Sequence, residues 1–192
     1  MTHGSNANKP STTVDMEQAE RTIRRAGTVS FLIFLAVSAL GWWLLPALVS
    51  FPDALIDQLA FALQVSTVPL FCVLVGVGMV STGRRFSPDD ISGSAFGPPS
   101  DTLAIKVAFL QNTLEQAVLA VGFYLAFVTV AGGPWLSVLL VSAALFVIGR
   151  VLFYRGYSKG VEGRAFGMTL TMMPAIVGYP VVFVLIFLRL LG

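Results

Sequence analysis

Residues 165–188 read AFGMTLTMMPAIVGYPVVFVLIFL and contain no aspartate, glutamate, lysine or arginine. A bilayer core about 30 Å thick is crossed by about 20 helical residues that rise about 1.5 Å each. This stretch is therefore long enough and apolar enough to cross a membrane as one helix. It predicts an integral membrane protein.

The composition of the whole chain supports the same class. Of 192 residues, 56% are hydrophobic and 11% are charged, and the mean hydropathy is +0.83. Because a soluble domain carries about 25% charged residues, a soluble enzyme, a disordered chain and a secreted disulfide scaffold are poor fits. The net charge of +2 is dispersed and gives no reason to expect a nucleic-acid partner.

Further runs without charge predict the remaining spans. Residues 26–52 and 58–83 lack charge, and residues 107–149 hold only Glu115 and are divided by Gly132-Gly133-Pro134. The expected fold is an all-α, polytopic membrane helix bundle. Its five predicted spans lie near residues 28–49, 59–81, 107–130, 135–154 and 168–190.

Basic residues predict the orientation. They precede the first span, lie between the second and third, and follow the fourth, whereas the links Ser50–Gln58 and Ala131–Pro134 contain neither lysine nor arginine. The positive-inside rule then places the N-terminus and two longer connections, Ser81–Lys106 and Tyr154–Gly167, in the cytoplasm. Residues 1–26 are expected to form a polar cytoplasmic tail, with a mobile part (Met1–Thr13) and a short polar helix (Val14–Arg25).

Few side chains are suited to familiar catalytic chemistry. The chain has one histidine, His3 in the polar tail, and one cysteine, Cys72 in an apolar run. A histidine-based triad or metal site is therefore not expected within one chain, and no metal is predicted. Cys72 is interpreted as a small residue facing lipid or the core.

The third predicted span carries polar residues into the membrane. Asn112 and Glu115 are three residues apart and share a helix face, with Gln111 and Gln116 beside them. An ionisable group at this depth needs a partner or an aqueous cavity, so it marks either a ligand site or a polar clamp between helices. Arg150, at the end of the fourth span, is the expected partner of Glu115.

Other residues near the cytoplasmic boundary have two readings. Tyr154 and Tyr157 share a helical stripe with Arg150, but aromatic residues at a membrane boundary also serve as interfacial anchors. Arg84, Arg85 and Lys159 could contact a ligand, or they could set topology and meet lipid headgroups.

Three stretches together resemble the MAPEG superfamily, the membrane-associated proteins of eicosanoid and glutathione metabolism. Asn112-Thr113-Leu114-Glu115 is similar to its Asn-x-x-Glu signature, and residues 150–157 are similar to its Arg-x-x-Tyr-x-x-Gly-Tyr segment. Arg84-Arg85-Phe86 with Gly97-Pro98-Pro99 resembles the first cytoplasmic loop of the leukotriene-forming synthase. The resemblance covers about residues 59–192.

The resemblance implies a four-helix domain at residues 55–192 and a homotrimer in membrane lipids. Glutathione would be a co-substrate held between subunits, and the other substrate would be a lipophilic small molecule. By the same resemblance Arg164 would be catalytic, stabilising the glutathione thiolate. The implied glutathione-binding residues are Asn112, Glu115, Arg150, Tyr157, Arg84 and Arg85.

The sequence departs from the family pattern in two respects. Ala108, Leu110 and Phe153 replace polar residues of the signature segments, and Gln116 stands where the family has a tyrosine. Residues 27–50 form an additional N-terminal span, an arrangement that resembles the mattrin branch, whose members are treated as trafficking or barrier proteins.

Two function classes therefore remain open at the sequence level. One is a glutathione-dependent transferase or peroxidase acting on lipophilic electrophiles. The other is a non-catalytic membrane scaffold or partner-binding protein. A transporter or channel is disfavoured because only one carboxylate enters a span and no pair of broken helices is evident.

Overall fold

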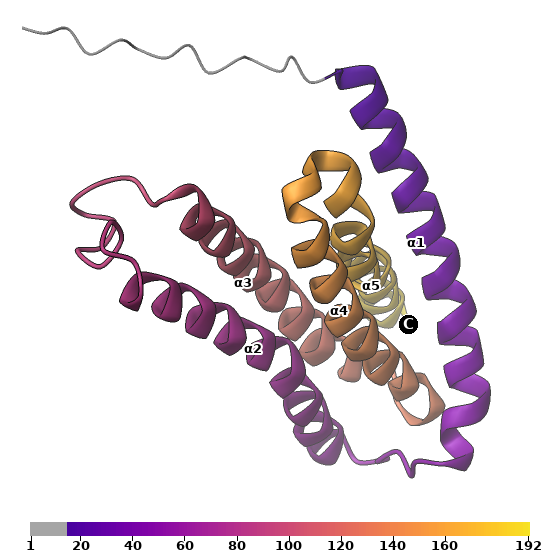
Figure 1. Cartoon of the computed structure of the whole chain (residues 1–192). Coiled ribbons are helices and arrows are strands. Elements are labelled where there is room, and N and C mark those ends of the chain that lie inside the picture. The colour runs from indigo at the N-terminus through magenta and orange to yellow at the C-terminus, as the bar shows by residue number, and fades with distance from the viewer. Residues whose placement is uncertain (1–14) are drawn as a thin grey trace, which may run out of the picture.

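A computed structural model describes residues 15–192, which form five long helices and no strand. Figure 1 shows these helices and the short connections between them. The helices are α1 (Met16–Leu44), α2 (Leu55–Arg85), α3 (Asp101–Val128), α4 (Ser137–Gly156) and α5 (Gly160–Leu191). Three short 3-10 helices complete the secondary structure: η1 (Leu45–Ala47), η2 (Gly133–Leu136) and η3 (Tyr157–Lys159).

The predicted all-α bundle, with one helix in addition to a four-helix core, is confirmed. Each predicted span overlaps one observed long helix, but α3, which contains the third predicted span, is not among the stretches that are apolar enough to cross a membrane. Three stretches are long and apolar enough to cross a membrane: Met16–Ala47, Leu55–Arg85 and Gly133–Leu191, the last of which contains both α4 and α5. The chain is therefore a multi-pass membrane protein.

Two expected boundaries were wrong. The polar segment that precedes the first span is not a separate helix, because α1 runs unbroken from Met16 into the span. Its start is capped by Asp15, whose carboxylate accepts hydrogen bonds from the backbone N–H groups of Glu17 and Gln18. The expected tail at Met1–Thr13 lies outside the described residues.

The connection expected at Tyr154–Gly167 is also shorter than predicted. Only η3 separates α4 from α5, which begins at Gly160. The positive φ of Gly160, 73°, reverses the chain within this short turn. By contrast, the α2–α3 connection between Arg85 and Asp101 is irregular, as expected.

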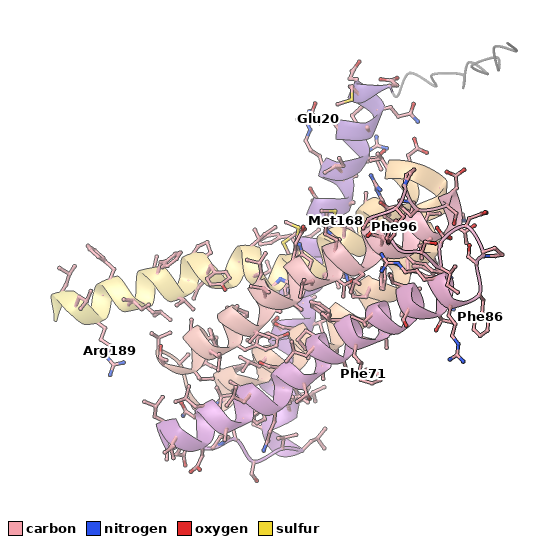
Figure 2. The ribbon with its side chains drawn as sticks, turned by 90° about the vertical axis from the view of Figure 1, so that its left-hand side faces the viewer. Glu20, Phe71, Phe86, Phe96, Met168 and Arg189 are labelled. Carbon is pink, nitrogen blue, oxygen red and sulfur yellow. The ribbon has the colours of Figure 1, made fainter. Side chains whose placement is uncertain are left out.

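Two helix pairs organise the bundle. In Figure 1, α2 packs along α3, α4 packs along α5, and α1 lies on the outer side of α4 and α5. The larger core is formed by α2, α3 and α4, with Val182 of α5, around Phe123, Tyr124 and Phe146. A second core joins α1 to α4 and α5 through Phe34. Figure 2 shows Phe71 of α2 on the outside of the bundle, where 63% of its surface is exposed in a single chain.

Glycine brings α4 and α5 into close backbone contact. A Cβ atom on Gly167 would overlap the backbone nitrogen of Phe153 and would lie 2.7 Å from the carbonyl oxygen of Gly149. No side chain fits in that space. The two helices can therefore carry Arg150 and Thr171 within hydrogen-bonding distance of each other.

Candidate functional site

Arg150 is the centre of a polar cluster inside the bundle. Its side chain lies on α4, and the residue is only 2% exposed. Its Nη1 donates a hydrogen bond of 2.7 Å to Oδ1 of Asn112 on α3. Its Nε donates one of 3.1 Å to Oγ1 of Thr171 on α5. One guanidinium therefore joins three helices.

Aromatic rings cover this guanidinium. Its carbon lies 4.7 Å from the ring centroid of Phe153 and 5.8 Å from that of Phe146. Contacts of this kind are attractive because the negative face of a ring meets a cation. Together with the two hydrogen bonds, they hold the guanidinium in one orientation.

The aromatic contacts continue to Arg164. The ring of Phe153 meets that of Tyr157 edge to face at 5.4 Å. The guanidinium carbon of Arg164, at the start of α5, lies 4.7 Å from the Tyr157 ring centroid. We call this series the Arg150–Arg164 row; it consists of Asn112, Arg150, Phe153, Tyr157 and Arg164. Four residues predicted from the sequence as site residues are thus brought together: Asn112, Arg150, Tyr157 and Arg164.

The predicted pairing of Arg150 with Glu115 within the chain was wrong. Glu115 is exposed and accepts a hydrogen bond of 3.3 Å from Gln111 on its own helix. Asn112 takes its place because a helix turns about 100° per residue, so positions three apart share a face only approximately. Within residues 15–192, the ion pairs join Arg21 to Glu17 and Arg24 to Glu20.

Arg84 and Arg85 lie apart from the row, at the end of α2. Arg84 donates a 3.4 Å hydrogen bond to Ser94, while Arg85 stacks on Phe86 at 5.7 Å. Arg84 also lines a cavity of about 250 Å³ beneath the α2–α3 loop.

Asp90 holds this loop in place. Its carboxylate accepts hydrogen bonds from the backbone N–H and hydroxyl of Ser100 and from the hydroxyl of Ser87. These hydrogen bonds, with a smaller contribution from the charge of Arg84, lower the pKa of Asp90 below its ordinary value of 3.8. The hydroxyl of Ser100 in turn caps α3 through the backbone N–H of Leu103.

Sequence reasoning missed Thr171 and the bridging role of Phe153. The available signal for Thr171 was its hydroxyl, because it lies within a run without charge, four residues after Gly167. In the sequence, Phe153 is notable only because it replaces the tyrosine of the family signature and so lacks a hydroxyl. Leu110, another departure from the family pattern, packs against Gly76 of α2, where an added Cβ would lie 3.1 Å from its Cδ1, and so serves helix packing.

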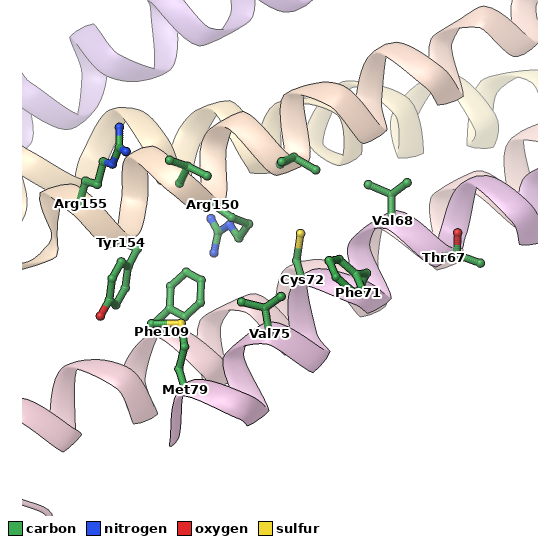
Figure 3. A pocket seen from close by; sticks show the side chains of 12 residues that line it. Thr67, Val68, Phe71, Cys72, Val75, Met79, Phe109, Arg150, Tyr154 and Arg155 are labelled. Carbon is green, nitrogen blue, oxygen red and sulfur yellow. The ribbon is translucent and has the colours of Figure 1, made fainter. Parts of the chain in front are cut away.

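A groove between α2 and α4 adjoins the cluster, as Figure 3 shows. It encloses about 620 Å³ and is lined mostly by apolar side chains, with Arg150 among them. No group of three or more histidine, cysteine, aspartate or glutamate side chains suited to a metal is found in the described part of the chain.

The fold and the cluster define a helical membrane protein with a polar site near one end of its bundle. The chain matches the MAPEG family over residues 59–185, from within α2 to within α5. The chain therefore belongs to the MAPEG family, and α1 lies outside the matched region. No curated protein and no solved structure matches the chain.

Proposed function

We propose that the protein is a glutathione-dependent transferase or peroxidase that acts on lipophilic electrophiles. The observation that carries the proposal is the Arg150–Arg164 row, in which two guanidinium groups and the amide of Asn112 lie in one contact series. The row lies in a member of the MAPEG family and inside a bundle that lipid surrounds.

Asn112 is oriented to receive a peptide. Because its Oδ1 accepts the hydrogen bond from Arg150, its amide NH₂ group is left to donate to a carbonyl or carboxylate of glutathione. Arg150 is then a positioning residue, since it fixes Asn112 from behind. This arrangement provides a hydrogen-bond donor, which the carbonyl and carboxylate oxygens of a peptide ligand need.

Arg164 supplies the charge that the reaction requires. A free thiol has a pKa of about 8.5, and a neighbouring cation favours the reactive thiolate. A guanidinium is suited to this task because it stays protonated at physiological pH. Stacking on Tyr157 holds Arg164 in place. The glutathione thiolate would then form a carbon–sulfur bond to the electrophilic carbon of a molecule that arrives from the membrane, while the bond from that carbon to its leaving group breaks and the leaving group departs with the electron pair.

Glu115 supports a homotrimer in which glutathione lies between subunits. Its carboxylate is exposed on α3, within the apolar part of the chain. A charged side chain that faces lipid costs roughly 2.5–3.5 kcal/mol, so a second copy of the chain is the natural cover. Glu115 would then face the ligand from one subunit while Arg164 faces it from the next.

A non-catalytic scaffold or partner-binding protein is the second candidate. Phe153 has no hydroxyl to offer a ligand, and Ala108 and Leu110 are apolar where the family signature is polar. The added helix α1 covers α4 and α5 through Phe34 and through a 2.9 Å hydrogen bond between Ser30 and Thr169. These features favour a protein whose helix bundle binds partners or acts as a scaffold and does not catalyse a reaction.

Calorimetric titration with glutathione separates the two candidates. The full chain in neutral detergent micelles is expected to give saturable heat, and Arg164→Ala is expected to lose most of it. Lys159→Ala is the matched control, because Lys159 is an exposed cation at the same end of the bundle. Absence of heat at millimolar glutathione, with the oligomer intact, would favour the scaffold.

If the protein is a transferase, replacing Arg164 should also lower the rate of the reaction. Arg164→Ala is expected to lower kcat about 10²–10³-fold, the range seen when a donor that stabilises developing negative charge is removed. The lost rate should be partly recovered at higher pH, where free glutathione ionises without help. Equal rates for Arg164→Ala and the wild type would contradict the assignment of Arg164.

A further inference from the structure

The start of α1 and the start of α5 lie at the same end of the bundle (Figure 1). They enclose a cavity of about 490 Å³. Asp15, Gln18 and Ala19 line it from the α1 side, and Gly160, Val161, Glu162 and Arg164 line it from the α5 side. Arg164 therefore shares a cavity with α1, a helix outside the region that matches the MAPEG family.

Buried contacts fix α1 against α5. Ala19 and Ser30 of α1 are both buried. The hydroxyl of Ser30 lies 2.9 Å from that of Thr169 on α5. Because the Thr169 hydroxyl donates to the carbonyl oxygen of Ala165, Ser30 is the donor between the two hydroxyls. The amino-terminal turn of α1 is thereby held beside the first turn of α5.

Two carboxylates share the cavity with Arg164, and both are already engaged. Asp15 accepts hydrogen bonds from backbone N–H groups in the first turn of α1. Glu162 accepts a hydrogen bond from the side-chain amide of Gln18. Among residues 15–192 the ion pairs lie within α1, so the guanidinium of Arg164 has none, and its stacking partner is Tyr157.

Glu162 is the natural competitor for this guanidinium. It lies two residues before Arg164 and lines the same cavity. A carboxylate tethered so close would pair with a free guanidinium through charge-assisted hydrogen bonds and neutralise its charge. The amide of Gln18 is neutral, so it can hold the carboxylate without adding a second charge.

We propose that Gln18 holds Glu162 away from Arg164 and thereby keeps the guanidinium available to a negatively charged group of a ligand. Gln18 is then a positioning residue that acts through Glu162. That the ligand is glutathione rests on the proposed function, whereas the separation of Glu162 from Arg164 does not. The additional helix α1 in this way contributes to the site, although it lies outside the matched region.

Calorimetric titration with glutathione measures the effect on ligand binding. Gln18→Ala frees Glu162 to pair with Arg164, so the Kd for glutathione should rise about two- to fivefold, the range that an exposed ion pair gives. Glu162→Gln alone should change the Kd less than about twofold. Adding Glu162→Gln to Gln18→Ala should restore the wild-type Kd, because no competing charge remains.

Met16→Ala is the matched control for Gln18→Ala. Met16 is an exposed, uncharged residue in the same turn of α1, and it does not line the cavity. Its replacement should leave the Kd unchanged. A loss of affinity that persists in the double variant would mean that Gln18 acts only through the stability of the fold, and it would overturn the proposal.

NMR of the full chain in micelles, with ¹⁵N-labelled arginine side chains and no glutathione, tests the separation directly. The Nε–Hε signal of Arg164, assigned through its loss in Arg164→Lys, should shift in Gln18→Ala and return in the double variant. An unchanged signal in Gln18→Ala would overturn the proposal. If the signal shifts as expected while the wild type binds no glutathione, the proposed function is wrong and the role of Gln18 stands.

Discussion

Arg150 is the residue at which α3, α4 and α5 meet, and its side chain donates hydrogen bonds to an amide and a hydroxyl, not to a carboxylate. Asn112 and Thr171 supply neutral acceptors, while Phe146 and Phe153 lie against the guanidinium. A buried charge held this way has little tolerance for the loss of one partner, because the remaining donors cannot reach water.

Asn112→Leu should therefore destabilise the protein clearly. The change leaves Nη1 of Arg150 without an acceptor, and leaving a charged donor unpaired costs about 3 kcal/mol or more. Gln111→Leu is the matched control because Gln111 is exposed on the same helix and bonds only to Glu115. Thermal unfolding in detergent is expected to show a lower Tm for Asn112→Leu alone. Equal Tm values would contradict the proposed importance of the Arg150–Asn112 hydrogen bond.

Asp90 makes the α2–α3 loop sensitive to acid. Because its pKa is lower in the folded protein than the ordinary 3.8, its contribution to stability is present above pH 3.8. That contribution is lost as the pH falls through the lowered value and the carboxylate gains a proton. The protection of the Ser100 amide against hydrogen exchange, relative to the intrinsic rate at each pH, should therefore fall in acid, and Asp90→Asn should show the lower protection already at neutral pH.

The adjacent aspartate provides the control for this experiment. Asp89 is exposed, and Asp89→Asn should leave the exchange at Ser100 and its pH dependence unchanged. An identical acid response in the wild type and Asp90→Asn would show that another group controls the loop.

At the scale of the helices, the five long helices could be predicted because long runs with little or no charge are typical of helices in a membrane bundle. The polar residues at the start of α1 were predicted to form a helix of their own. In the structure they belong to the same helix as the apolar span, because a change from polar to apolar residues does not by itself end a helix. The start of α5 at Gly160 was missed for a related reason: the glycines at 156, 160 and 163 suggested a loop. Gly156 and Gly163 instead allow close contact between α4 and α5.

The α4–α5 contact gives a prediction at this scale. Gly167→Ala should destabilise the bundle strongly or prevent folding, because its Cβ would overlap backbone atoms that cannot move aside. Gly78→Ala on α2 is the matched control, with no atom within 4 Å of the added Cβ. It should be neutral or stabilise by about 0.5–1 kcal/mol. Similar Tm values for the two variants would contradict the close packing of α4 on α5.

Only part of the candidate site could be predicted from the sequence, because the remaining contacts depend on how the helices pack against one another. Motif order placed Asn112, Arg150, Tyr157 and Arg164 correctly near one another. It could not show that Asn112 rather than Glu115 meets Arg150, because the choice depends on the rotation of α3 against α4. It also could not show Phe153 as the contact between Arg150 and Tyr157, since a ring contact has no signature in the sequence.

At the scale of the whole molecule, the arrangement of basic residues predicts which face is cytoplasmic. Arg85 is the last residue of α2, directly before the α2–α3 loop, and the α4–α5 turn holds Lys159, whereas the links on the opposite side contain no lysine or arginine. A chain that crosses the membrane five times would have its two termini on opposite sides.

Cysteine labelling in intact cells checks this orientation. In a Cys72→Ser background, Ser94→Cys in the α2–α3 loop should resist a membrane-impermeant maleimide until the cells are opened. Ala131→Cys, in the link before α4, should react from outside. The reverse pattern would contradict the predicted orientation while leaving the fold unchanged.

The central claim is that the Arg150–Arg164 row forms part of a glutathione site in the assembled protein. Electron cryomicroscopy of the full chain in nanodiscs with glutathione tests it most directly. We expect a trimer in which ligand density touches Asn112 and Arg164 of one subunit and Glu115 of the next. A well-resolved assembly in which Glu115 faces lipid and no density adjoins Arg164 would contradict it.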